Sequence, residues 1–218
     1  MFWKTVKINK ADFGVITAVL GGVFLLLELV ISIIMVTVRP DSVPTLAGTM
    51  LPFMAGFLGV FVSAVEIPMC FEFMLRYSVT RRGALAVTLG LIAVEVVYSF
   101  GLAVALAQLE RALVYGIWLR VNPALAVEEF GLPLWGVALG AAGVLLLGLI
   151  CGTVLQRFGR KAMVILWVLW MAVMLLMQSV DWDKIFSASL GGYIPLAAVL
   201  LVLSVLSVWS LMRATVKN

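Results

Sequence analysis

The chain has 218 residues, of which 64% are apolar and 12% are charged, and its formal net charge is +4. Soluble domains average about 45–50% apolar and about 25% charged residues, so this composition excludes an ordinary soluble protein and indicates a chain built for lipid. The sequence contains no histidine. The absence of histidine excludes Ser-His and Cys-His catalysis and histidine-ligated metals. The positive net charge does not indicate nucleic-acid binding, because basic residues in a membrane protein mark its cytoplasmic side.

The first 13 residues, MFWKTVKINKADF, carry a helical pattern of their own. On a helical wheel apolar and aromatic residues share one face, and lysines lie opposite or at its border. This pattern favours a short helix in the inner headgroup layer, and a frayed tail with a few lysines is the alternative. The residues of the predicted interfacial helix are Phe2, Trp3, Lys4, Val6, Lys7, Lys10 and Phe13.

Six apolar runs follow, each of 19 residues or more, which is long enough to cross a bilayer at about 1.5 Å per residue. They cover residues 15–38, 47–72, 84–108, 132–155, 162–180 and 193–212. The longest connection, 109–131, is expected to lie along the outer membrane interface. Since no connection can hold a soluble domain, we expect an all-α membrane protein with one transmembrane domain over residues 1–218.

The basic residues indicate which side of the membrane each connection occupies. If the N-terminus is cytoplasmic, 11 of the 15 basic residues fall inside. These are Lys4, Lys7, Lys10, Arg76, Arg81, Arg82, Arg157, Arg160, Lys161, Arg213 and Lys217, and the outer group is Arg39, Arg111, Arg120 and Lys184. Because basic residues are enriched on the cytoplasmic side, we expect both termini to be cytoplasmic.

Three glutamates lie inside the predicted spans. Glu28 and Glu95 are midway along the first and third spans, and Glu66 is about two turns from the inner end of the second. A charge at the bilayer centre costs roughly 2.5–3.5 kcal/mol on insertion scales, so such residues usually face a bundle interior or a wet cavity. Two interpretations stay open: a translocation path for a cation or cationic peptide, or protonated carboxyls that hydrogen-bond between helices.

The fourth span carries Gly136, Gly140, Gly148 and Gly152, which lie at multiples of four residues and so share one face of a helix. Small residues at this spacing let helix backbones approach closely. We expect this face to pack against another helix of the same chain rather than to form a dimer seam.

The sequence carries no phosphate-binding loop, because GRKA at 159–162 lacks both the glycine spacing and the Ser or Thr after lysine. No serine has a partner that would activate it. We therefore expect a protein that is not an enzyme and that binds no cofactor or metal itself.

The segment EFMLRYSVTRRGAL, residues 72–85, interrupts the apolar sequence with three arginines. Glu72 and Arg76 are spaced to support a helix that leaves the second span, and Thr80 can cap the third span. A short basic helix held by two spans would act as a mechanical coupler. The residues assigned to it are Glu72, Arg76, Tyr77, Ser78, Val79, Thr80, Arg81 and Arg82.

The topology and the text FEFMLRYSVTRRGALAVTLGLIAVEVVYSFGLAVALAQLE, residues 71–110, resemble the small membrane (permease) subunits of type-2 (ABC-2) ABC exporters. In that family a turn reading like G-x-[ST]-R-[RK] precedes the third span. Residues 78–82 match this turn, although Ser78 or Tyr77 replaces the usual glycine.

The resemblance implies a subunit of a bacterial cell (inner or plasma) membrane that forms a homodimer or heterodimer around the substrate path. It also implies docking on a separate ATP-binding subunit through the 73–83 cytoplasmic loop, with ATP and Mg on that partner. The alternative is a stand-alone secondary transporter or channel that uses Glu28, Glu66 and Glu95 as a proton or cation relay. An accessory membrane protein without transport is a third interpretation.

Overall fold

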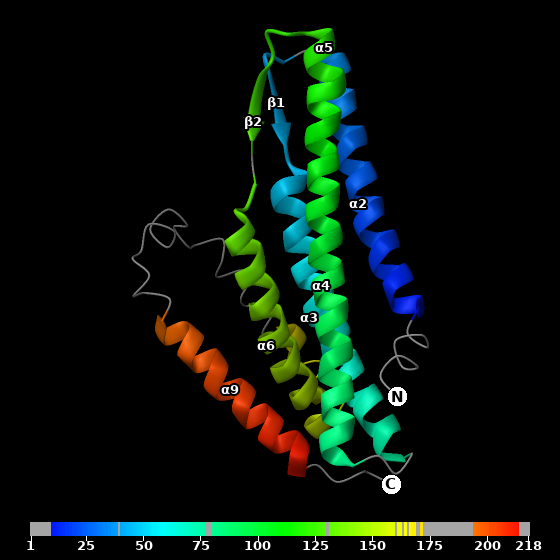
Figure 1. Ribbon diagram of the computed structural model, residues 1–218, viewed down its shortest axis with the longest axis vertical. Helices are drawn as coiled ribbons and strands as arrows, with labels where there is room; N and C mark the ends of the chain where they lie inside the picture. The colour runs from blue at the N-terminus through cyan, green and yellow to red at the C-terminus, as the bar shows by residue number, and fades with distance from the viewer. Residues whose placement is uncertain are drawn as a thin grey trace. The chain divides into compact units, whose positions relative to one another are not determined.

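The computed structural model describes residues 10–38, 40–76, 80–129, 131–159, 161–162, 164, 166–168, 171 and 194–213, and these residues are mostly helical (Figure 1). The chain divides into two compact units. Unit 1 comprises Met1–Gly59 and Gly90–Val144, and unit 2 comprises Val60–Leu89 and Leu145–Asn218.

Four long apolar helices match the first four predicted spans. They are α2 (Lys10–Thr37), α3 (Ala47–Arg76), α4 (Arg81–Leu113) and α6 (Leu134–Phe158), and each is long and apolar enough to cross a membrane. The sixth predicted span falls on α9 (Ile194–Arg213). Most of the fifth lies outside the described residues.

Helix α2 is continuous from Lys10, so Lys10 and Phe13 belong to the same helix as the first span. Nothing in the sequence after Lys10 forces a break, since Gly14 is tolerated inside a helix whose neighbours are apolar. The other residues of the predicted interfacial helix, Phe2, Trp3, Lys4, Val6 and Lys7, lie outside the described residues.

The connection after the third span differs from the expectation. Helix α4 does not turn to lie along the interface at residue 109. It continues through the π-helical turn η1 (Val114–Trp118) and the short α5 (Leu119–Val121). The resulting 41-residue run, Arg81–Val121, is about 61 Å long, roughly twice the thickness of a hydrocarbon core. The apolar residues of 109–121 therefore extend the helix of the third predicted span.

Two short strands, which the sequence analysis did not anticipate, join the connections of unit 1. Strand β1 (Ser42–Thr45) pairs in parallel with β2 (Ala126–Glu129), and Val43 lies opposite Val127. Behind the pair is a small apolar core. It consists of Ile31, Val43, Val114 and Leu125, with Met35, Trp118, Leu119 and Val127 packed against it. We refer to β1, β2, η1 and α5 together as the strand cap.

In unit 2, the glycine ladder of α6 packs against α3 as expected. A Cβ atom placed on Gly152 would lie 2.7 Å from Ile67 side-chain atoms, and one on Gly148 would lie 2.8 Å from the hydroxyl of Ser63. Real Cβ atoms essentially never approach that closely. The prediction of close packing within the chain is therefore confirmed at these two positions.

In unit 1, the ladder makes looser contacts. A Cβ atom on Gly140 would lie 3.6 Å from the ring of Phe100, which is ordinary contact. One on Gly136 would meet only Pro133, just before the start of its own helix. The tight contacts of the ladder thus belong to its C-terminal half.

Candidate functional site

The connection between α3 and α4 is the segment to which the sequence analysis assigned coupling. Helix α3 ends at Arg76 and α4 begins at Arg81. The Thr80 hydroxyl accepts a hydrogen bond from the Gly83 backbone N–H at 3.3 Å, and the Thr80 carbonyl accepts one from the Ala84 N–H at 2.8 Å. Thr80 is therefore the N-cap of α4, as predicted.

The spacing of Glu72 and Arg76 predicted a helix that leaves the second span, and α3 continues to Arg76. A short coupling helix stays a prediction, because residues 77–79 lie outside the described residues. Residues 73–76 belong to α3, and residues from Arg81 on belong to α4. In the last turns of α3, Phe71 and Met74 are buried within unit 2, which favours continuation of the helix. Tyr77, Ser78 and Val79, together with the Arg76 side chain, lie outside what the structure describes, while Glu72 is half-buried on α3.

Arg81 has a partner that sequence reasoning missed. Its Nη1 donates a hydrogen bond to the Met212 carbonyl at 3.1 Å, at the end of α9. The last carbonyls of a helix lack partners within it and carry partial negative charge, so a guanidinium is favourable there. The two residues are 131 positions apart, and no local sequence signal connects them.

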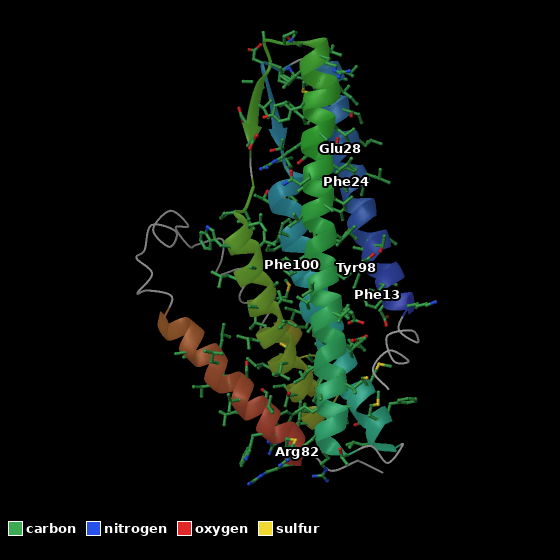
Figure 2. The ribbon with its side chains drawn as sticks, viewed as in Figure 1. Phe13, Phe24, Glu28, Arg82, Tyr98 and Phe100 are labelled. Carbon is green, nitrogen blue, oxygen red and sulfur yellow. The ribbon has the colours of Figure 1, made fainter. Side chains whose placement is uncertain are left out.

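The helix ends at this side of unit 2 form a basic surface. Among the described residues, five basic side chains are exposed on it, and Figure 2 labels one of them, Arg82, near the start of α4. They are Arg81, Arg82, Arg157, Lys161 and Arg213. The Arg213 guanidinium also lies 3.9 Å from the centre of the Trp209 ring, in a cation–π contact. A surface of this charge favours an anionic partner, such as an acidic protein face or lipid headgroups.

The three predicted glutamates do not share one unit. Glu28 on α2 and Glu95 on α4 belong to unit 1, and Glu66 on α3 belongs to unit 2. Glu95 is buried, with 2% of its surface exposed, while Glu28 and Glu66 are partly buried. Glu95 is therefore enclosed by the protein rather than exposed on its surface.

A fourth glutamate, which sequence reasoning missed, caps the start of α3. Glu110 is 1% exposed on α4. Its Oε1 accepts hydrogen bonds from the N–H groups of Leu46 at 2.9 Å and Ala47 at 3.1 Å, and its Oε2 lies 3.0 Å from the Ala47 nitrogen. Leu46 has no side-chain acceptor, so it cannot cap the helix that begins at Ala47. The carboxylate of a neighbouring helix supplies the cap instead, at the positive end of the α3 dipole.

Glu110 is also linked to its surroundings in unit 1. Glu28 is close enough to interact with it electrostatically. The next residue, Arg111, pairs with Glu129 of β2 at 3.4 Å, and the Tyr115 hydroxyl donates to the same carboxylate at 3.0 Å. Because the charges of the ion pair are exposed, it contributes at most about 1 kcal/mol, and its main effect is to hold β2 beside α4.

Helices α2 and α4 make a second polar contact in unit 1, which Figure 2 shows around Phe13 and Tyr98. The Thr17 hydroxyl donates to the Phe13 carbonyl at 2.7 Å and lies 2.7 Å from the Tyr98 hydroxyl. Since Thr17 has one proton, Tyr98 is the donor between the two hydroxyls. The Phe13 and Tyr98 rings meet edge to face with centroids 5.2 Å apart.

The described residues thus hold two polar assemblies, one in each unit. In unit 2, a basic surface surrounds the α3–α4 connection. In unit 1, Glu110 and the strand cap bind the ends of α2, α3 and α4 together. Comparison with known proteins finds no matching family model, no similar curated protein and no similar solved structure.

Proposed function

We propose that the chain is the membrane subunit of an ATP-driven exporter of the type-2 ABC kind. In this proposal it lies in a bacterial cell membrane with both termini cytoplasmic and pairs with a second membrane subunit around the substrate path. The α3–α4 connection docks on a separate ATP-binding subunit, which binds ATP and Mg. The resemblance of residues 71–110 to such subunits supports this function.

The observation that carries the proposal is that one short connection is joined or hydrogen-bonded to three helices. Helix α3 leads into it, Thr80 starts α4 at its end, and Arg81 is bonded to the last turn of α9. We expect a displacement of this connection to be passed to α3, α4 and α9. Such a connection suits a part that transmits motion from a docked ATPase to the membrane domain.

The charge of the surrounding surface supports docking on a soluble partner. The exposed basic side chains of unit 2 would meet an acidic or polar groove on the ATP-binding subunit. Arg81 is engaged with Met212, whereas Arg82 is exposed at the start of α4. Arg82 is therefore the better probe of docking, because its replacement leaves the Arg81–Met212 contact in place.

Co-purification tests the proposal. The tagged full-length chain is expressed from its natural operon and solubilised in mild detergent, and bound proteins are identified by mass spectrometry. We expect an ATP-binding protein with a phosphate-binding loop at one copy per chain. The partner should be lost with Arg82→Glu and retained with Arg120→Glu, which reverses the charge of an exposed arginine of unit 1 that is not part of the basic surface. If no such protein accompanies the wild-type chain, the exporter function is wrong.

A stand-alone secondary transporter or channel is the second candidate, and the burial of Glu95 favours it. It predicts that the purified chain alone moves protons or cations across liposome membranes. Glu28→Gln, Glu66→Gln and Glu95→Gln keep the side-chain shape and remove the charge. If the chain conducts alone and at least one of these variants abolishes conduction, the relay replaces the exporter function. If none of them changes it, the carboxyls serve packing.

A further inference from the structure

The end of α9 and the start of α4 bring two arginines of the basic surface together. The Arg81 Nη1 donates to the Met212 carbonyl at 3.1 Å, and Arg213 is the next residue of α9. Both arginines are exposed. Within the part of the chain that the structure describes, neither forms an ion pair with a carboxylate. The two guanidinium groups can therefore bind an anion from outside the chain.

Each guanidinium keeps hydrogen-bond donors for such an anion. The Met212 carbonyl accepts from one N–H group of Arg81, and a guanidinium has several more. The Arg213 guanidinium carbon lies 3.9 Å from the centre of the Trp209 ring, in a contact that needs no N–H hydrogen bond. Because the planar guanidinium fork binds phosphate oxygens through paired N–H groups, the two arginines suit a phosphate group.

The side of α9 that carries Arg213 is apolar toward the middle of the helix. Residues spaced by three or four positions share this side and end at the arginine. They are Val202, Leu206, Trp209 and Arg213. The three apolar side chains are 51% to 60% exposed. From the first to the last residue of this row the helix rises about 16 Å, close to half of a hydrocarbon core about 30 Å thick, so the row has the length of one membrane leaflet.

The order of side chains along this row matches a phospholipid better than an acidic protein. Aliphatic residues come first, the Trp209 indole follows, and the Arg213 guanidinium ends the row. Tryptophan is enriched at the level of the headgroups, and arginines near helix ends extend to that level. An acidic protein would meet Arg213 but would leave the exposed aliphatic side chains uncovered. An acyl chain covers them, and the phosphate attached to it lies at the height of the arginines.

We propose that the end of α9 and the start of α4 bind an anionic phospholipid. Its phosphate lies between Arg81 and Arg213, and one acyl chain lies along Trp209, Leu206 and Val202. We refer to these five residues as the lipid site. The inference goes beyond the proposed function, because it rests on the membrane location of the chain and not on an ATP-binding partner.

Native mass spectrometry of the full-length chain in detergent tests the lipid site. Dioleoyl phosphatidylglycerol and dioleoyl phosphatidylcholine are titrated separately, so that only the headgroup differs. We expect tighter binding of phosphatidylglycerol. A basic residue near a membrane surface contributes about five-fold to the affinity for anionic lipid, so Arg213→Gln should weaken phosphatidylglycerol binding about five-fold and Arg81→Gln with Arg213→Gln about 25-fold.

Matched variants separate loss of the site from loss of the fold. Arg120→Gln removes an exposed arginine of unit 1 and should leave phosphatidylglycerol binding unchanged. Arg81→Gln also breaks the bond to Met212, so Arg213→Gln alone tests the site with that bond in place. Arg213→Lys keeps the charge without the planar fork and should recover part of the affinity. Size-exclusion chromatography checks that each variant is folded.

Fluorescence quenching locates the acyl chain. The full-length chain is reconstituted in phosphatidylcholine vesicles with a small fraction of phosphatidylglycerol that carries bromine on its acyl chains, which quenches nearby tryptophans. Since the chain has seven tryptophans, the quenching of Trp209 is taken as the difference between the wild type and Trp209→Phe. We expect this difference to exceed that obtained with brominated phosphatidylcholine and to fall with Arg213→Gln.

Three outcomes overturn the lipid site. They are equal affinity for the two lipids, phosphatidylglycerol binding that the arginine variants leave unchanged, and displacement of the lipid by inorganic phosphate, which would mean that the arginines bind free phosphate instead. None of these measurements involves an ATP-binding protein. A chain that binds phosphatidylglycerol at these arginines but brings down no ATPase keeps the lipid site and loses the exporter function.

Discussion

Replacing Glu110 should destabilise unit 1 more than replacing any exposed carboxylate of the strand cap. Its carboxylate satisfies the backbone N–H groups of Leu46 and Ala47, the first donors of α3. Hydrogen bonds to a charged group contribute about 1.5–3 kcal/mol each, and neutral ones about 1 kcal/mol. Glu110→Gln keeps one acceptor oxygen and turns two charge-assisted bonds into neutral ones, so we expect a loss of about 2 kcal/mol.

Glu110→Ala should cost more, because it leaves two buried N–H groups without an acceptor. Each such group costs about 1–3 kcal/mol, so we expect about 4 kcal/mol in total. For a chain of about 200 residues, 1 kcal/mol shifts the thermal midpoint by about 2–4 °C. The glutamine variant should therefore melt about 4–8 °C below the wild type, and the alanine variant about twice as far below.

Thermal unfolding in detergent, followed by tryptophan fluorescence, measures these shifts, and the chain contains seven tryptophans. Glu128→Gln is the matched control, because this carboxylate is exposed on β2 and should change the midpoint little. If Glu110→Ala and Glu128→Gln melt at the same temperature, Glu110 does not stabilise the start of α3 and the capping argument fails.

Two further predictions concern packing and topology. Gly148→Val should overpack the α3–α6 contact and lower the stability by about 1–3 kcal/mol in the same melting assay. Gly143→Val should lower it less, because a Cβ at that position meets nothing within 4 Å. Equal losses of stability in the two variants would contradict the packing argument. An impermeant maleimide applied to intact cells should label a cysteine at Lys184 and leave one at Lys217 unlabelled, and the reverse pattern would refute cytoplasmic termini.

The long helices and one cap were predictable from the sequence because their signals are local. Runs of apolar residues marked α2, α3, α4 and α6, since a membrane span needs only length and hydrophobicity. Thr80 was predictable as a cap because a capping side chain acts within three residues. The glycine spacing of α6 likewise indicated close packing, and the tight contacts with Ser63 and Ile67 confirm it in unit 2.

The contacts that were missed join residues far apart in the chain. Strands β1 and β2 have four residues each, which is too short to give a strand signal in the sequence. One precedes α3 and the other follows α4 along the chain, so their pairing has no local signal either. Leu46 indicates that α3 lacks a local cap, but only the fold shows that Glu110 supplies it. The extension of α4 to Val121 was missed because the mixed apolar and charged residues of 109–121 resemble an interfacial segment in sequence.

The capping of α3 by Glu110 also sets an order of events during synthesis. Ala47 leaves the ribosome 63 residues before the carboxylate that it binds. At about 5–20 residues per second, translation of that stretch takes roughly 3–13 s. Throughout this interval the first N–H groups of α3 must be satisfied by water or by the insertion machinery. Helix α3 is therefore made before the carboxylate that caps it, and its start is completed only when residue 110 of α4 has been made.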